Sequence, residues 1–335
     1  MTGVKSIIKF LKQKAAPLCL SAVLAGALLA GCGNEPLSDA FDTVETSAKY
    51  GIGSSEAVDI VKPYSDGLVV TSGDAVENSS IDTSQSEASL LFDIDTRDIL
   101  LSHNIMQQVY PASTTKIMTA LVVLENVDNL DDTLTVSSNA VNLPSGSSVA
   151  YLQEGDVVTV RDALYGLLLN SGNDAAIALA EYVSGSVDSF VQLMNQEAQS
   201  LGATHTHYVN SSGLHDDNHY TTAYDTYLIF NAAIQNDTFL QIASTPTYTA
   251  TYTHADGSAA SEEYVTTDEF LDGTYDAPTG ITLLAGKTGT TTEAGCCLVL
   301  LSKGADGNRY ISVVMDSPSK EELYPFMSTI LSLEK

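Results

Sequence analysis

The clearest shortage in this 335-residue sequence is positive charge. Lys and Arg total 14 against 42 Asp and Glu, which gives a formal net charge of −28. A field of that sign repels nucleic acid and anionic lipid headgroups, and no basic patch is visible along the chain. We therefore expect no nucleic-acid partner and attribute the acidity to solubility. Hydrophobic residues make up 44% of the chain, which excludes a wholly disordered protein.

Cysteine is also scarce, with four in the chain. No CxxC or other spacing typical of a metal or redox site occurs. Cys296 and Cys297 are adjacent, and neighbours in a strand point to opposite faces, so a disulfide between them would be strained. We interpret them as buried thiols of an apolar strand. Close histidine pairs occur at 205 and 207 and at 215 and 219, but without neighbouring cysteines we expect no metal and no other cofactor.

The N-terminal apolar run is too short to span a membrane. It covers 14 residues, Leu18 to Gly31, whereas a spanning helix needs about 20. It follows four lysines and ends in Leu-Ala-Gly-Cys, which resembles the bacterial lipobox. We predict that residues 1–31 are a lipoprotein signal peptide and that Cys32 carries lipid. The exported protein would then be attached to the outer face of the cytoplasmic membrane, facing the cell wall. An ordinary signal peptide or an uncleaved anchor is the alternative.

In the rest of the chain, the amino-acid composition and the apolar periodicity change near residue 86. Residues 32–85 are rich in Ser, Asp, Glu and Gly, and their apolar periodicity is weak apart from a short run at 67–70. This composition predicts a flexible acidic tether, with a small ordered strand as the alternative. Residues 86–335 carry regular apolar patterns and form the expected catalytic domain.

The order of elements in that domain predicts its fold class. A hairpin is expected at 88–103, and helices at 113–125, on either side of a break at 170–173, after a capping Ser186, and near 223–235. A hairpin and loop at 246–280, three strands between 283 and 317 and a final helix complete the domain. We predict an α/β (α+β) sandwich in which a mainly antiparallel five-stranded sheet is flanked by helices and carries a helical subdomain.

Three short motifs combine reactive side chains with suitable spacing. Ser113 and Lys116 are three residues apart at a predicted helix start, so the hydroxyl and the amine share a face near unpaired backbone N–H groups. Ser171-Gly172-Asn173 fills the break between two predicted helices. Lys287-Thr288-Gly289 lies on a predicted inner strand, where the glycine would let a ligand approach closely. Each motif alone is weak, because a capping serine beside a solvated lysine explains the first equally well.

Together, in this order and at separations of 58 and 116 residues, the motifs are specific. The set is typical of penicillin-binding proteins and class A β-lactamases. From Ala88 to the C-terminus the sequence resembles the low-molecular-mass penicillin-binding proteins, the serine D-Ala-D-Ala carboxypeptidases of the β-lactamase/DD-peptidase-like superfamily. The flanking stretches "YPASTTKIMTAL", "SGNDAAIALAE" and "GKTGTTTEAGCCLV" belong to the same resemblance.

The resemblance implies roles for the first two motifs. Ser113 would be the nucleophile that attacks the carbonyl of the penultimate D-alanine. Lys116 would be its base, provided that burial and a second cation keep its amine neutral. Ser171 would relay a proton toward the leaving amine, and Asn173 would orient Lys116 and hold the substrate amide.

The third motif would bind the substrate. Lys287 and Thr288 would hold the carboxylate of the terminal D-alanine, and Gly289 would lie beside it. Backbone N–H groups of Ser113 and Thr290 would form the oxyanion hole. The implied substrates are peptidoglycan stem peptides ending in D-Ala-D-Ala, and β-lactam antibiotics would acylate the same serine.

The sequence departs from the family in two respects. Members often carry an arginine just after the last strand, whereas "DSPSKEELY" offers only Lys320 there. Many also have a second, β-rich domain and an amphipathic C-terminal anchor helix. We expect the N-terminal lipid to take the place of that anchor.

Three alternatives remain open. A D,D-endopeptidase that cuts crosslinks would use the same residues. A class A β-lactamase would need a glutamate about 35 residues after the second motif, and the corresponding stretch "THTHYVNSSGLHDD" contains none. A lipid-anchored sensor would bind muropeptide or β-lactam without turnover, although every motif residue is intact.

We predict that Cys32→Ser abolishes lipid attachment, because the thiol is the atom that would carry the lipid. The measurement is incorporation of labelled palmitate together with detergent phase partitioning, and Cys19→Ser is the control. Loss of label in Cys32→Ser alone is expected. Equal labelling of both variants would contradict the lipobox interpretation.

Overall fold

The computed structural model describes residues 67–71 and 81–334. The chain divides into two units, Met1–Pro63 and Tyr64–Lys335, and all described residues fall in the second. The predicted signal peptide, Cys32 and most of the predicted tether lie outside the described residues.

Both ends of the domain sequence contribute to one antiparallel sheet. Its strands are β1 (Ala88–Asp93), β2 (Ile99–His103), β7 (Thr282–Thr291), β8 (Gly295–Lys303) and β9 (Arg309–Ser317), in the order β2-β1-β9-β8-β7. Every neighbouring pair is antiparallel. The predicted five-stranded sheet is therefore confirmed. One detail was wrong: β7, which carries the third motif, is an edge strand and not an inner one.

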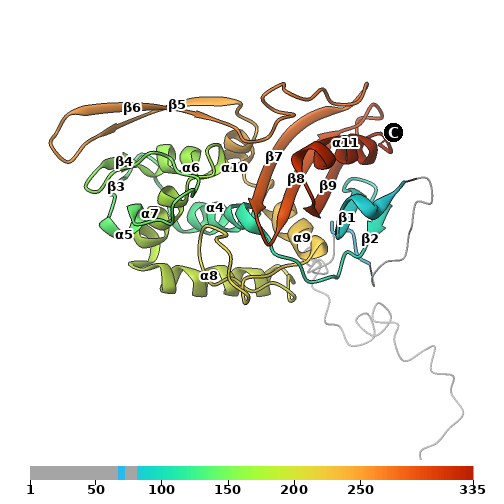
Figure 1. Ribbon diagram of the computed structural model, residues 1–335, viewed down its shortest axis with the longest axis horizontal. Coiled ribbons are helices and arrows are strands. Elements are labelled where there is room, and N and C mark those ends of the chain that lie inside the picture. The colour runs from blue at the N-terminus through green and yellow to red at the C-terminus, as the bar shows by residue number, and fades with distance from the viewer. Residues whose placement is uncertain (1–66, 72–80, 335) are drawn as a thin grey trace, which may run out of the picture. The chain divides into compact units, whose positions relative to one another are not determined.

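Helices cover both faces of this sheet, as Figure 1 shows. Helix α11 (Lys320–Leu331) packs on one face, where Leu298, Leu300 and Val314 meet its apolar side chains. On the other face, Val299 and Val313 join the larger core. Burial on both faces explains why β8 and β9 are almost continuously apolar in sequence.

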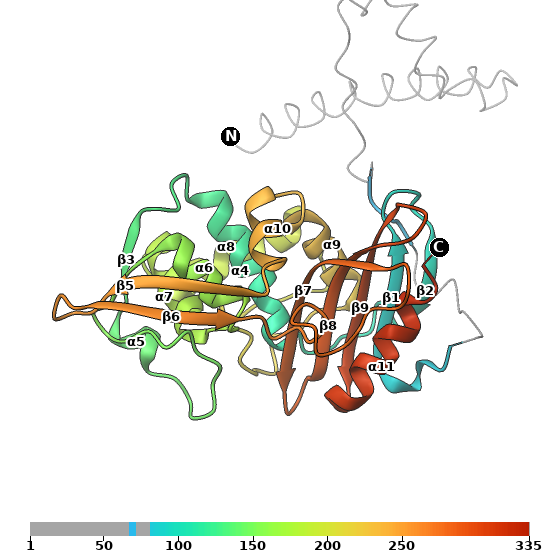
Figure 2. The same cartoon turned by 90° about the horizontal axis from the view of Figure 1, so that it is seen from above.

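The helical region lies beside the edge strand β7 (Figure 2). It contains the short 3₁₀ turn η3 (Ala112–Thr114) and the helices α4 (Thr115–Asn126), α5 (Ser138–Val141), α6 (Val160–Leu168), α7 (Asn173–Ser184), α8 (Val187–Ser200), α9 (Ala223–Ala233) and α10 (Asp237–Ala243). Nine of the twelve residues of α4 are buried. This helix is therefore the centre around which the others pack, and it directly follows Ser113.

Two short strands and two short helices, α5 and α10, were not predicted from the sequence. A second sheet, in the order β3-β4-β5-β6, combines β3 (Thr133–Thr135) and β4 (Val157–Thr159) with the hairpin β5 (Thr247–Thr253) and β6 (Ala259–Val265). The hairpin was predicted, but the three-residue strands are too short to show an alternation. Helix α10 has only seven residues, so its periodicity is equally short.

Part of the predicted tether belongs to the folded domain. The side chain of Val69 is fully buried in the main core. Its backbone N–H donates to the Tyr227 hydroxyl at 2.8 Å, and its carbonyl accepts from the Tyr224 hydroxyl at 2.9 Å. Both tyrosines lie on α9. The 3₁₀ turn η2 (Thr83–Gln85) also precedes β1. Order on this side of the domain thus begins before residue 86.

We predict that Val69→Ala lowers the free energy of unfolding by about 2 kcal/mol, because it removes buried methyl groups and leaves a void. The matched control is Val70→Ala, since Val70 is 64% exposed, and its effect should stay within about 0.5 kcal/mol. Urea denaturation measures both variants. Equal effects would show that residues 67–71 do not pack on α9 in solution.

Candidate active site

The first motif lies at the junction of η3 and α4. Ser113 is in the 3₁₀ turn and Lys116 is in the first turn of α4, so the helix begins two residues later than predicted. Ala112 has φ of 46°, a conformation that costs energy for any residue with a Cβ. The Thr114 hydroxyl donates to the Pro111 carbonyl at 2.7 Å. Ser113 therefore lies in a turn that is strained at Ala112 and is held by the hydrogen bond from Thr114 to Pro111.

Lys116 is completely buried, and its amine contacts Ser113 of the first motif and Asn173 of the second. Its Nζ lies 2.9 Å from Ser113 Oγ, 2.8 Å from Asn173 Oδ1 and 2.7 Å from the Ser212 carbonyl oxygen. All three contacts are neutral groups. Burial, reinforced by the positive charge of Lys287, holds the pKa of Lys116 well below its usual range, while Asp174 opposes the shift. A neutral amine retains two N–H donors and one lone pair, which matches two carbonyl acceptors and one hydroxyl donor.

The second and third motifs meet at Ser171 and Lys287. Ser171 lies between α6 and α7 with φ of 56°, another sparsely populated conformation. Its Oγ accepts from Lys287 Nζ at 3.2 Å, and the same ammonium donates to the Thr288 carbonyl at 2.9 Å. Lys287 is 2% exposed, and burial lowers its pKa to about 7, against the raising effect of Asp268.

Gly289 brings the edge strand against the nucleophile. A Cβ at this position would lie 3.0 Å from the Pro111 carbonyl oxygen and from the backbone nitrogens of Ser113 and Thr114. We expected this glycine to let a ligand approach; the structure adds a second reason for it, because the η3 turn lies where a Cβ would be. Thr290, the next residue, consequently lies beside the Ser113 turn, and both line the same cavity.

Sequence analysis missed the turn that completes the Lys116 site. The side-chain oxygen of Asn210 accepts from the backbone N–H groups of Ser212 at 3.1 Å and Gly213 at 2.7 Å. This orients the Ser212 carbonyl toward Lys116. Gly213 has φ of +86°, and a Cβ there would lie 1.8 Å from the Ala112 carbonyl oxygen, so no other residue fits. The Asn-Ser-Ser-Gly composition was a turn signal that could have identified it.

Two buried side chains, Asp174 and His219, form hydrogen bonds that hold the segments around the site in place. Asp174 accepts from the backbone N–H groups of Ala150 at 2.7 Å and Leu152 at 3.1 Å, which holds the loop before α6 against α7. His219 Nδ1 accepts from a backbone N–H, so its Nε2 faces Thr115 Oγ1, 2.8 Å away, as the donor of a neutral ring. Burial lowers the pKa of His219 to about 4, so it stays neutral near pH 7.

A cavity of about 290 Å³ lies beside Ser113 and Asn173. Its lining comes from the first two motifs (Ser113 and Asn173) and from three loops, residues 144–148, 212–215 and 290–293.

Within residues 67–71 and 81–334, no group of three His, Cys, Asp or Glu side chains is placed to hold a metal ion. Across the same residues, no helix combines the length and hydrophobicity that a membrane span requires. Cys296 and Cys297 are buried free thiols, as predicted.

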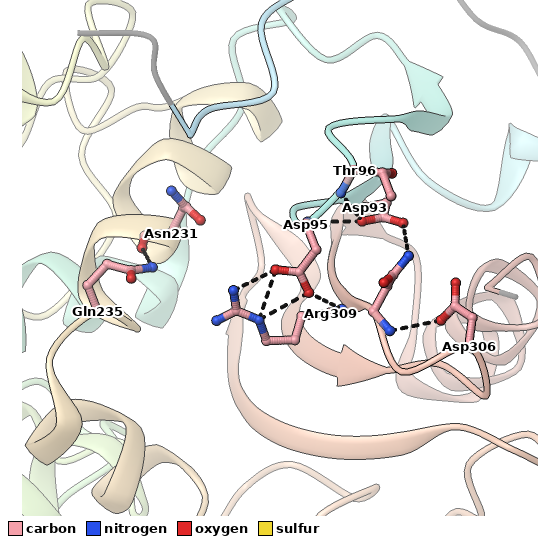
Figure 3. Close-up of polar contacts among 8 residues, drawn as sticks. Asp93, Asp95, Thr96, Asn231, Gln235, Asp306 and Arg309 are labelled. Carbon is pink, nitrogen blue, oxygen red and sulfur yellow. Dashed lines mark hydrogen bonds and ion pairs between the residues drawn. The ribbon is translucent and has the colours of Figure 1, made fainter. Parts of the chain in front are cut away.

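Two cations, Lys320 and Arg309, could replace the arginine that family members often carry just after the last strand, but neither lines this cavity. Lys320 Nζ forms an ion pair with Glu269 Oε1 at 2.6 Å. Arg309 begins β9, at the end of the strand opposite the position where the family places its arginine, and pairs with Asp95 at 2.6 Å (Figure 3). Lys116 and Lys287 do not line the cavity either, but both are hydrogen-bonded to serine or asparagine side chains of the motifs.

We predict that Gly289→Ala destabilises the protein by about 1–3 kcal/mol, because the methyl group forces β7 away from the η3 turn. Thermal unfolding measures the loss, and Gly257→Ala is a control for adding a Cβ, since nothing lies within 4 Å of it. Gly257 has φ of +87°, so this control also carries backbone strain. A smaller loss in Gly289→Ala than in the control would contradict the close approach.

Comparison with known proteins agrees with this geometry. The family model described as D-alanyl-D-alanine carboxypeptidase (peptidase S11) matches residues 75–319. The Bacillus subtilis D-alanyl-D-alanine carboxypeptidase DacF is 33% identical over 245 residues, which cover 71% of this chain and 59% of DacF. DacD of Escherichia coli is 37% identical over 50% of this chain and 46% of its own length. The chain therefore spans only about half of these curated relatives.

A Streptomyces protein is similar over more of its length. The D-alanyl-D-alanine carboxypeptidase of Streptomyces sp. strain K15 is 38% identical over 62% of this chain and 72% of its own. The crystal structure titled Streptomyces K15 DD-transpeptidase superposes with a TM-score of 0.70 and 31% identity, covering 76% of this chain and 98% of that one. The sheet order, the helical region and the matched motifs have one explanation: the chain belongs to the D-alanyl-D-alanine carboxypeptidase family of serine peptidases.

Proposed function

We propose that this protein is a serine D-Ala-D-Ala carboxypeptidase that removes the terminal D-alanine from peptidoglycan stem peptides through an acyl-enzyme. The observation that carries the proposal is the contact between Ser113 Oγ and the buried amine of Lys116 at 2.9 Å. A serine hydroxyl becomes nucleophilic when an adjacent base takes its proton. Lys116 is positioned as that base, and burial together with Lys287 favours the neutral amine.

The neutral amine has a defined orientation. Asn173 Oδ1 and the Ser212 carbonyl accept the two N–H groups of Lys116, which leaves its lone pair for the Ser113 hydroxyl. Proton transfer to Lys116 accompanies attack of Ser113 Oγ on the carbonyl carbon of the penultimate D-alanine. Because α4 is buried along its length, the two atoms keep this geometry before substrate arrives.

Lys287 and Thr288 are the proposed carboxylate-binding residues. The Lys287 ammonium has only neutral hydrogen-bond acceptors, Ser171 Oγ and the Thr288 carbonyl. A substrate carboxylate would supply the missing opposite charge. Ser171 lies next to Lys287 and, in this proposal, passes a proton toward the leaving amine of D-alanine. Its contact with Lys287 supports a position on the carboxylate side of the scissile bond.

The tetrahedral oxyanion would be held by the backbone N–H groups of Ser113 and Thr290. Support comes from Gly289, whose packing against the Ser113 nitrogen brings the two backbone segments together. Collapse of this intermediate releases free D-alanine and leaves the shortened peptide on Ser113. Water then completes hydrolysis. β-Lactams would acylate Ser113 in the same way and leave slowly.

Related reactions use the same acyl-enzyme. A transpeptidase passes the acyl group to an amine, and the solved Streptomyces K15 neighbour bears that title. A D,D-endopeptidase would cut crosslinked peptides instead. A β-lactamase is disfavoured because the loop that would carry its glutamate, residues 204–217, contains none and supplies the Ser212 carbonyl to Lys116. A non-catalytic sensor is disfavoured by the complete set of side-chain contacts.

The same proposal places the protein outside the cytoplasm. Its substrate is a cell-wall peptide, and the lipobox-like stretch ending at Cys32 would attach it by lipid to the outer face of the cytoplasmic membrane. A membrane tether and a peptidoglycan substrate put the enzyme and its target in the same compartment.

Mass spectrometry after penicillin treatment tests the nucleophile. We expect a persistent adduct on Ser113 in the wild type, none in Ser113→Ala, and an unchanged adduct in Ser244→Ala, which alters an exposed serine at the end of α10. Release of D-alanine from a D-Ala-D-Ala peptide should fall by several orders of magnitude in Ser113→Ala. An adduct on another residue would refute the nucleophile assignment, and rapid loss of the adduct would favour a β-lactamase.

The same assay separates the related reactions. Free D-alanine without added amine indicates a carboxypeptidase, whereas an exchange product with added glycine indicates a transpeptidase. Cleavage of a crosslinked dimer indicates an endopeptidase. An adduct without any of these products would indicate a sensor and contradict the proposal.

A further inference from the structure

A buried carboxyl group lies behind the substrate-binding strand, on the side away from the cavity. Asp268 belongs to the segment that links β6 to β7, and it is 1% exposed. Its Oδ1 accepts from the Phe270 backbone N–H at 3.0 Å. Its Oδ2 has no hydrogen-bond partner among the described residues. A carboxylate oxygen left unpaired in the interior is costly, so its retention requires a reason.

Gly286 explains how Asp268 approaches the strand. A Cβ on Gly286 would lie 2.2 Å from Asp268 Oδ2, so the carboxyl group rests against the strand backbone where no other residue would leave room. Lys287 is the next residue. Because successive side chains of a strand point to opposite faces, Lys287 lies on the face of β7 that is opposite to Asp268 and α11. The Asp268 carboxyl and the Lys287 side chain therefore lie on opposite sides of one strand, and the charge of each acts on the pKa of the other.

A second contact ties the same segment to the third motif. The hydroxyls of Thr267 and Thr288 are hydrogen-bonded to each other. Thr267 and Asp268 thus contact the strand on either side of Lys287, at Thr288 and at Gly286. This segment positions the proposed carboxylate-binding residues from outside the cavity.

We propose that Asp268 is a positioning residue that favours the positively charged form of Lys287 in the free enzyme, so that a larger share of the enzyme presents a cation to the substrate carboxylate. Lys287 is buried and donates only to neutral oxygens, and a buried ammonium without a counter-charge tends to lose its proton. Asp268 supplies that counter-charge until the substrate carboxylate arrives. Through Lys287 it also helps Lys116 to remain neutral, because the charge on Lys287 disfavours a second cation.

Other charged groups around Asp268 do not replace this interaction. The neighbouring acid on its own segment is Asp272, which is exposed. Glu269 is paired with Lys320, and the Tyr324 hydroxyl from α11 accepts from the Glu269 backbone N–H. From β8, the apolar side chain of Leu300 lies against Gly286, as the Asp268 carboxyl does. Lys287 is therefore the cation from the packed elements that acts on the Asp268 carboxyl.

The pKa shifts of Asp268 and Lys287 together set the direction in which kcat/KM should depend on pH. Burial raises the pKa of Asp268 to about 6, so its charge is present above that pH. The Lys287 pKa of about 7 includes the raising effect of Asp268. Removing the carboxylate must therefore move loss of the Lys287 charge to lower pH. Below pH 6 the wild-type carboxyl is itself protonated, so the wild type and a neutral variant should converge.

The test is Asp268→Asn, which keeps the acceptor for Phe270 and removes the charge. With a peptide ending in D-Ala-D-Ala, we expect the alkaline limb of kcat/KM to shift down by about one pH unit, and KM near pH 8 to rise on the order of tenfold. The value of kcat should change little, because bound substrate carboxylate keeps Lys287 charged. Asp276→Asn, the matched control on the same segment, removes an exposed charge and should leave the profile unchanged.

A purely structural role for Asp268 predicts a different result. Asp268→Asn would then lower the melting temperature without moving the alkaline limb or separating KM from kcat, and that outcome overturns the proposal. If the variant does not fold, Lys287→Met tests the same coupling from the other side. Carbon-13 NMR of the aspartate carboxyls should show the Asp268 pKa rising in Lys287→Met, and an unchanged pKa would refute the interaction.

The kinetic test rests on the proposed carboxypeptidase function, whereas the NMR titration does not. A wild-type protein that releases no D-alanine would refute the function. Coupling between Asp268 and Lys287 would still appear in the titration, so the two failures are distinguishable.

Discussion

The site depends on placing two lysines in one small, buried space and giving a proton to only one of them. Lys116 and Lys287 are both nearly inaccessible to water, and neither has a carboxylate within ion-pair distance among the described residues. Two adjacent ammonium groups would repel each other strongly in a low-dielectric interior. The protein resolves this conflict by surrounding Lys116 with neutral acceptors and setting Asp268 behind Lys287. One amine is thereby suited to act as a base and the other to bind an anion.

The scaffold maintains this arrangement by close backbone packing. Ser113, Ser171 and Lys287 are far apart in sequence and come from η3, the break between α6 and α7, and β7. Gly289 allows β7 to touch the η3 turn, and Gly213 allows a third segment to contact the same turn. Ala112 and Ser171 have positive φ angles, which the surrounding packing must stabilise. Burial of the lysines follows from these contacts, because the packed segments cover both side chains.

The sequence predicted the parts of this structure that have long periodicity or motif spacing. The five-stranded antiparallel sheet, the helix pair around residues 170–173 and the strand carrying Lys287 were all foreseen. The second sheet was missed because two of its strands have three residues each. The edge position of β7 was also missed, because strand order is a property of tertiary packing and not of any single segment.

The roles of residues that depend on contacts with distant parts of the sequence were harder to predict. Gly289 was assigned to ligand access alone, and its packing against the chain's own backbone was not foreseen. The Ser212 carbonyl escaped notice because a main-chain acceptor has no residue-type signal. Asp268 could not be identified either, since its importance comes from a Gly286 contact and from a charge on the far side of a strand.

The central claim is that Lys287 keeps its proton to a higher pH than Lys116, so that a neutral amine lies beside an ammonium group. Carbon-13 NMR of the lysine Cε atoms, titrated against pH and assigned with single lysine variants, measures both protonation states directly. The account predicts that Lys116 titrates at a lower pH than Lys287 and well below a typical lysine. A Lys116 that stays protonated at neutral pH, or that loses its proton only after Lys287, would contradict it.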